Sequence, residues 1–160
     1  MRRGLMLAAS LVAILGAAHA AEDKPPFQFE RVGEAPGTTA QLVTKAQSFL
    51  AERQGSAKVA TQQVDKEAGR IVNDIVLMNS DAGMFDAFHG VSTRLILEFK
   101  EGRYRLRATD IWGADRDGKR SSWGDVNGAN RYRIEPLAQA VLDRFAADLD
   151  AYLKRPMDNW

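Results

Sequence analysis

The chain has 160 residues, 45% of them hydrophobic and 27% charged, and its formal net charge is +1. A chain of this length and composition forms one ordinary globular domain, which excludes an intrinsically disordered protein. The absence of cysteine excludes disulfide bonds, thiol nucleophiles and thiolate metal sites.

Residues 1–20 have the three-part pattern of a secretory signal peptide, with a cleavage position after Ala20. The apolar stretch is too short for a membrane-spanning helix, so we expect export to the bacterial periplasm or secretion, with no membrane anchor after cleavage. Loss of Arg2 and Arg3 lowers the number of Lys and Arg from 22 to 20 against 21 acidic residues, a net charge of −1. Nucleic acid is therefore not an expected partner.

The mature chain begins with a polar lead, residues 21–26, which ends in two prolines and is expected to be flexible. Residues 27–32 alternate apolar and polar side chains, as a half-buried strand does. Thr38 and Gln41 have the spacing of a capping box, which predicts the start of a helix. The folded domain is expected to be single and to span residues 27–156.

Two strands are expected over residues 57–65 and 70–79, joined by a hairpin turn in which Gly69 takes a positive φ. The second of these strands has apolar residues on both faces. This pattern predicts a central strand that is covered, at least in part, on both sides.

A second hairpin is the clearest element of the sequence, because Glu101 and Gly102 form a good two-residue turn between two alternating segments. Pairing about this turn places Phe99 opposite Tyr104, Leu97 opposite Leu106, Glu98 opposite Arg105 and Ile96 opposite Arg107. The face expected to pack on helices carries Leu95, Leu97, Phe99, Tyr104, Leu106 and Ala108. The opposite face carries Arg94, Glu98, Arg103, Arg105 and Arg107, and we expect it to point toward solvent.

The remaining chain is expected to form a long polar loop over residues 113–133 and a helix over 135–154, with Pro136 in its first turn. The order strand, helix, four strands, helix predicts an α+β fold. Its architecture would be a two-layer sandwich, in which a mainly antiparallel five-stranded sheet is backed by two helices.

Four stretches of the sequence carry a resemblance to a known family: FQFERV, AQSFLAERQG, VDKEAGRI and, above all, LILEFKEGRYRLRATDI. They resemble a bacterial family of exported domains of unknown function with a TATA-binding-protein-like (TBP-like) fold, the DUF4468-like domains. The resemblance covers roughly residues 27–112 and implies a curved antiparallel sheet backed by helices. It implies no catalytic residue, and a fold shared with a DNA-binding protein does not imply DNA binding.

Catalytic and metal-binding candidates are few. His89 is the single histidine of the mature chain, which excludes a multi-histidine metal centre. Asp81, Asp86 and Ser92 lie near it in the sequence, but no recognisable nucleophile motif accompanies them. We therefore expect no catalytic residue, no metal and no cofactor.

The segment from Asp115 resembles the start of a calcium loop, but its twelfth position is Val126 instead of a carboxylate. Asp110, Asp115 and Asp117 offer paired carboxylates of the kind that glycoside cleavage uses. An envelope-polymer hydrolase that uses carboxylates near 110–117 is therefore the alternative function.

The first hypothesis is an exported, non-enzymatic binding or structural domain of the bacterial envelope. Its expected contact surface consists of Arg94, Arg103, Arg105, Arg107, Trp112 and Trp123. Arginines bind carboxylate or phosphate through a fork of donors, so the partner would be an anionic small molecule or an envelope protein. A solvated sheet face explains the same arginines without any ligand, because Glu98 opposite Arg105 relieves their repulsion. No oligomeric state is predicted.

Overall fold

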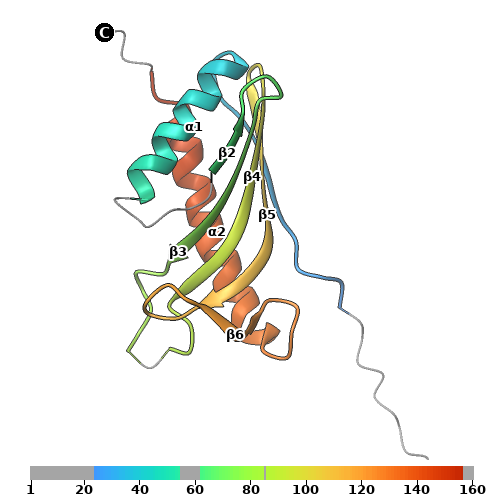
Figure 1. Ribbon diagram of the computed structural model, residues 1–160, viewed down its shortest axis with the longest axis vertical. Coiled ribbons are helices and arrows are strands. Elements are labelled where there is room, and N and C mark those ends of the chain that lie inside the picture. The colour runs from blue at the N-terminus through green and yellow to red at the C-terminus, as the bar shows by residue number, and fades with distance from the viewer. Residues whose placement is uncertain (1–23, 55–61, 85, 157–160) are drawn as a thin grey trace, which may run out of the picture.

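The computed structural model describes residues 24–54, 62–84 and 86–156, so the expected signal peptide and residues 57–61 of one expected strand lie outside the described residues. The chain folds into two helices and six strands (Figure 1). In chain order these are β1 (Phe29–Glu34), α1 (Thr39–Gln54), β2 (Gln62–Asp65), β3 (Arg70–Met78), β4 (Gly90–Lys100), β5 (Arg103–Ala114), β6 (Arg120–Asp125) and α2 (Arg131–Leu153).

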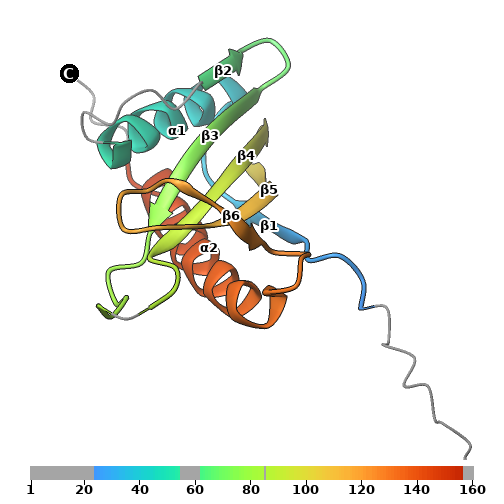
Figure 2. The same cartoon turned by 60° about the horizontal axis from the view of Figure 1, so that its bottom comes forward.

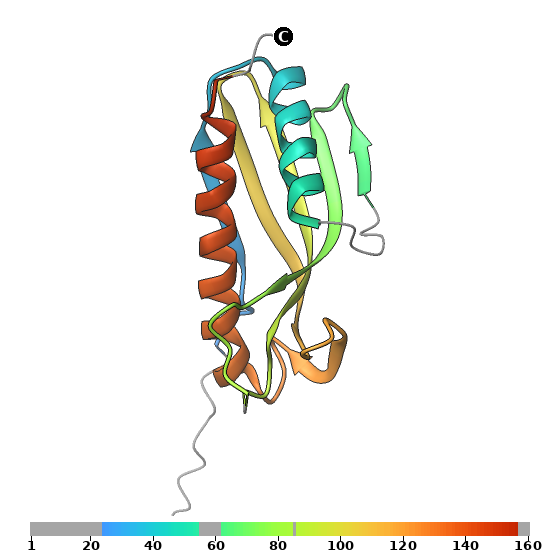
Figure 3. The ribbon, with the colours of Figure 1, turned by 90° about the vertical axis from the view of Figure 1, so that its left-hand side faces the viewer.

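All six strands belong to one antiparallel sheet. Five of them follow the order β1-β5-β4-β3-β2, and β6 pairs with β5. Both helices lie against the same face of this sheet (Figures 1 and 3). The predicted α+β two-layer fold is confirmed, but the sheet has six strands where five were expected.

The β4–β5 hairpin has the predicted register. All four predicted cross-strand pairs are present, and Gly102 has a φ of +74° in the turn. The residues expected to face the helices are buried: Leu95, Leu97, Phe99, Tyr104, Leu106 and Ala108. The arginines therefore project from the face that neither α1 nor α2 covers, which is called the open face below.

α1 begins as the capping box predicts. The Thr38 backbone N–H donates to Oε1 of Gln41 over 2.9 Å, and the Gln41 N–H donates to the Thr38 hydroxyl over 3.4 Å. These bonds satisfy N–H groups that a helix start otherwise leaves without acceptors. The helix then packs Leu42, Val43, Ala46, Phe49 and Leu50 into the core.

The helices cover one face of β3, and the partial cover expected on its other face is limited to the end where the β5–β6 hairpin approaches Val76. Ile71 and Ile75 are buried under the helix layer, whereas Val76 and Met78 on the open face are 39% and 48% exposed. The open-face valines and methionine reflect the preference of strands for such side chains rather than a second layer.

Residues 113–133 are not a single loop, which is a second correction. β5 continues to Ala114, and β6 returns beside it with Trp112 opposite Asp125 and Ala114 opposite Arg120. Backbone hydrogen bonds to β5 hold β6 in place. β6 therefore forms although its own sequence does not alternate apolar and polar residues. The polar side chains Ser122 and Lys119 are exposed, which is why composition suggested a loop.

α2 begins at Arg131, four residues before the expected start. The N–H groups of Arg133 and Ile134 donate to the carbonyl of Asn130, and Ile134 is fully buried. Pro136 is therefore inside the helix instead of in its first turn, and it has no N–H for the carbonyl four residues earlier. Burial of Ile134 extends the apolar stripe by one turn and favours the longer helix.

Neither helix of the described chain is long and apolar enough to cross a membrane.

Candidate functional site

The open face is built from cross-strand rows of side chains. One row runs from Arg70 on β3 through Glu98 on β4 and Arg105 on β5 to Val32 on β1. The neighbouring row toward the β4–β5 turn contains Lys100, Arg103 and Glu34, and these positions come from three separate strands. The two rows therefore bring together charged residues that are up to 71 positions apart in the sequence, from Glu34 to Arg105.

Two arginines of the expected contact surface share one carboxylate. Arg105 donates to Oε2 of Glu98 through Nε over 2.8 Å and pairs with it through Nη2 over 2.6 Å, while Arg107 Nη2 lies 3.3 Å from the same oxygen. Burial raises the pKa of Glu98, but the hydrogen bond from Arg105 and the charges of both arginines outweigh burial and hold that pKa below its usual value. Arg105 and Arg107 thus have an internal counter-ion.

Arg94 is also paired. Its Nε and Nη2 donate to the two carboxylate oxygens of Asp74 over 2.7 and 2.9 Å. The hydrogen bond from Arg94 is the main cause that holds the pKa of Asp74 below its usual value. This two-pronged pair leaves Arg94 fewer free donors for a ligand.

Trp112 lies at the opposite end of the open face from the β4–β5 turn, in a cluster around Asp110. Its Nε1 donates to Oδ1 of Asp110 over 3.1 Å, and the guanidinium of Arg120 stacks 4.0 Å from the Trp112 ring centroid while also pairing with Asp110. Among the described residues, Asp110 is the one non-glycine residue with a positive φ, at +52°. This conformation lies beside an irregularity in the β4–β5 register and aims the carboxylate at Arg120.

Trp123 lies elsewhere. Its ring packs 5.8 Å from that of Phe88, a buried core residue, and Asn130 donates to its carbonyl. The structure therefore associates Trp112 with the charged open face and Trp123 with the end of the core. The two tryptophans do not form one aromatic rim in the contacts that the described residues make.

The β5–β6 hairpin crosses β3 and β4 at this same end of the sheet (Figure 2). A Cβ built on Gly118, in the hairpin turn, would lie 3.6 Å from Cγ1 of Val76 on β3. The hairpin thus covers part of the open face at the Trp112 end, and no described element covers the end near the β4–β5 turn (Figure 2).

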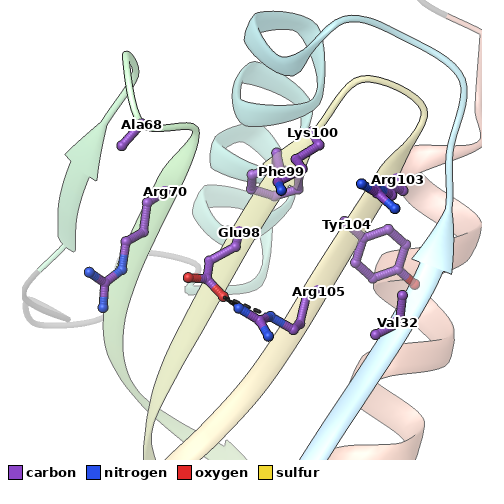
Figure 4. Close-up of a pocket in the computed structure, with 9 residues that line it drawn as sticks. All are labelled: Val32, Ala68, Arg70, Glu98, Phe99, Lys100, Arg103, Tyr104 and Arg105. Carbon is purple, nitrogen blue, oxygen red and sulfur yellow. Dashed lines mark hydrogen bonds and ion pairs between the residues drawn. The ribbon is translucent and has the colours of Figure 1, made fainter.

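The uncovered end contains a hollow of about 630 Å³. It is lined by Val32, Ala68, Arg70, Glu98, Phe99, Lys100, Arg103, Tyr104 and Arg105 (Figure 4). Arg70 projects from β3 on one side of Glu98, and Arg105 projects from β5 on the other side. This hollow is called the cationic groove, because four basic side chains and one carboxylate give its lining a formal charge of +3.

Three of these basic side chains make no ion pair with another described residue. Within residues 24–54, 62–84 and 86–156, ion pairs involve Arg94, Arg105 and Arg107 of the open face but not Arg70, Lys100 or Arg103. Arg103 was expected from the sequence, whereas Arg70 and Lys100 were missed. Lys100 is two positions from Glu98, so strand alternation places it on the same face. Arg70 joins the groove only through the β3–β4 pairing.

The catalytic alternatives are not assembled in the described contacts. Asp81 pairs with Arg144 on α2, Asp86 accepts the Gly83 N–H, and Ser92 lies on β4 across from Trp112. Both ring nitrogens of His89 are buried without a partner among the described residues.

Asp115, which was a candidate carboxylate, accepts the N–H groups of Asp117 and Lys119 and so shapes the β5–β6 turn. No group of three or more metal-binding side chains occurs in the part of the chain that the structure describes.

The fold is an α+β fold of the TBP-like type, and two solved structures share it. A TBP-like protein from Parabacteroides distasonis matches with a TM-score of 0.59 over 79% of this chain and 91% of its own, at 12% identity. A DUF4468 family protein from Bacteroides ovatus matches with a TM-score of 0.51 over 88% of this chain and 95% of its own, at 17% identity.

The likeness to these two proteins shows the fold, so the DUF4468-like, TBP-like resemblance inferred from the sequence is confirmed at that level. No family model matches the chain, and no curated protein matches it. The function must therefore be argued from the site.

Proposed function

We propose that this chain is an exported, non-enzymatic binding domain that holds an anionic partner on the open face of its sheet. The observation that carries the proposal is the cationic groove, whose lining includes Arg70, Lys100 and Arg103, three basic side chains that make no ion pair with any described residue. Cations on a curved surface attract a carboxylate or phosphate, and arginine binds either group through paired donors. The partner is an anionic small molecule or an acidic surface of an envelope protein.

The proposed binding site is the cationic groove at the β4–β5 turn end of the open face. It is smaller than the contact surface expected from the sequence. Arg94, Arg105 and Arg107 remain on the same face, but each is already bound to a carboxylate of the sheet. Releasing such an arginine for a ligand costs the interaction that it makes in the free protein. Arg70, Lys100 and Arg103 bind an anion without first losing an ion pair with a described residue.

Export is part of the proposal and is supported by the pattern of residues 1–20. The periplasm or the cell exterior would then supply the partner. The full chain expressed in a bacterium is expected to be recovered from the periplasmic extract or the medium with Ala21 at its N-terminus, as mass spectrometry would show. A chain retained in the cytoplasm with its first twenty residues contradicts export.

Binding is tested on the processed protein with phosphocellulose as the anionic probe. A variant with Arg70→Gln, Lys100→Gln and Arg103→Gln is expected to elute at clearly lower salt than the wild type. A matched control with Lys24→Gln, Arg144→Gln and Lys154→Gln removes the same charge from ion pairs that surround α2. Equal elution of the two triple variants would show that net charge alone governs retention, which contradicts a site in the groove.

A further inference from the structure

Resting on this proposed function, we infer that the cationic groove takes a ligand with two anionic groups, and that Glu98 occupies the place of one of them in the free protein. One anionic group binds Lys100 and Arg103, and Arg70 adds its charge from the other side of Glu98 (Figure 4). The second replaces the Glu98 carboxylate on Arg105.

Glu98 lies at the centre of the cationic groove (Figure 4). It lies in the cross-strand row between Arg70 and Arg105, in the middle of the groove lining (Figure 4). Its carboxylate is the one negative charge among the groove side chains. A carboxylate at the centre of a basic hollow is the chemistry that the groove itself is suited to bind.

Only one oxygen of the Glu98 carboxylate accepts hydrogen bonds from the described residues. Every hydrogen bond that the described residues make to this carboxylate goes to Oε2: Arg105 Nε lies at 2.8 Å and Arg107 Nη2 at 3.3 Å. Oε1 receives none from the described residues, and the Glu98 side chain is 31% exposed. Glu98 is thus held through one oxygen, on a side chain with room to turn away when a ligand anion approaches Arg105.

The spacing of the arginines on the sheet sets the distance between the two anionic groups. Arg103 and Arg105 are two positions apart on β5, which separates their backbones by roughly 6–7 Å. Arg70 and Arg105 are separated by one intervening strand, or about 10 Å. The unpaired cations and Arg105 therefore suit a ligand whose anionic groups are about 6–10 Å apart, and these groups are phosphates or carboxylates.

The test measures Kd by calorimetry for two pairs of probes. The phosphate pair is orthophosphate and tripolyphosphate, a chain of three phosphates with an anionic group at each end. The carboxylate pair is acetate, with one carboxylate, and adipate, with two. The readout is the ratio of the two Kd values within a pair, because this ratio reports the second anionic group. For the wild type we expect the longer probe of at least one pair to bind about tenfold tighter, as a charge-assisted contact would provide.

Glu98→Gln removes the competing charge and is expected to widen this ratio about threefold or more. Arg105→Gln removes the site for the second anionic group. The ratio of the acetate Kd to the adipate Kd is then expected to be close to one. Glu34→Gln is the matched control. Glu34 lies on β1 opposite Arg103, so the substitution removes one negative charge beside Arg103. It frees no arginine from an ion pair, because Glu34 makes none with the described residues. The ratio of the two Kd values should therefore equal that of the wild type.

The outcomes separate the two proposals. In one outcome the probes bind to the wild type and the triple variant of Arg70, Lys100 and Arg103 does not bind them, which supports the anion site. If Glu98→Gln and Arg105→Gln then leave the ratio of Kd values unchanged, the two-group ligand is overturned and the anion site stands. If that triple variant binds every probe as the wild type does, both proposals fail. The pair with the wider ratio identifies the ligand chemistry as phosphate or carboxylate.

Discussion

At the scale of single residues, Gly33 shows how closely β1 packs on the sheet. Gly33 lies opposite Tyr104 in the β1–β5 register, and a Cβ built on it would lie 2.4 Å from the Tyr104 ring. The ring is fixed, because the Tyr104 hydroxyl donates to Asp150 on α2 over 3.0 Å. Burial, and then this hydrogen bond, raise the pKa of Tyr104, so the hydroxyl remains a donor at any physiological pH.

Gly33→Ala is therefore expected to destabilise the protein by about 1–3 kcal/mol, because the added methyl group displaces the Tyr104 ring from its place between β1 and α2. Thermal unfolding followed by circular dichroism measures the effect. Gly83→Ala is the control, since a Cβ there meets its nearest atom at 3.5 Å, an ordinary contact. Equal melting temperatures for the two variants would contradict this account.

At the scale of elements, the β5–β6 hairpin depends on a small number of side chains. β6 pairs with β5 through two register positions, and Arg120 adds a stack on Trp112 and an ion pair with Asp110. Both side chains of the pair are about half exposed, so the ion pair contributes little on its own. The stack and the ion pair together hold the hairpin over the Trp112 end of the open face.

Arg120→Gln is expected to loosen β6 locally, by about 1 kcal/mol, while the global melting temperature changes little. Hydrogen exchange of the β6 backbone amides should quicken about fivefold, and exchange in β3 and β4 should stay the same. Arg116→Gln, in the same hairpin, is the control for loss of one charge. Unchanged exchange in β6 would mean that backbone pairing alone holds the hairpin.

At the scale of the whole molecule, ion pairs determine the response to acid. Hydrogen bonds from Arg94 and Arg144 hold the pKa values of Asp74 and Asp81 below their usual range, and Lys24 does the same for Glu135. A carboxyl group whose pKa is lower in the folded state stabilises the fold above its unfolded pKa. This stabilisation is lost as the pH falls through the lower, folded pKa.

The melting temperature is therefore expected to stay level from pH 7 to about pH 5 and to fall below about pH 4, where carboxyl groups of the unfolded chain become protonated. Scanning calorimetry across this range measures the effect. Arg94→Gln restores an ordinary pKa to Asp74, so this variant should lose less stability between pH 5 and pH 3 than the wild type. An equal loss in both proteins would exclude the Asp74–Arg94 pair as a source of acid sensitivity.

Local signals in the sequence were sufficient to predict the capping box of α1 and the register of the whole β4–β5 hairpin. Both are determined by residues within a few positions of one another: Thr38 with Gln41, and alternating side chains about Glu101 and Gly102. β6 and the start of α2 were missed because their positions depend on partners elsewhere. β6 forms by pairing with β5, and Ile134 is helical because the core buries it.

The candidate site divides in the same way. The sequence by itself determined that Arg103, Arg105 and Arg107 share one face of a strand, because strand side chains alternate. Only the tertiary structure decided which arginines are free to bind. The β3–β4 pairing brings Arg70 beside Glu98, and Glu98 takes Arg105 and Arg107 as its partners. Ion pairing acts over a few ångströms, so it depends on which strands become neighbours, and that depends on packing of the whole sheet against its helices.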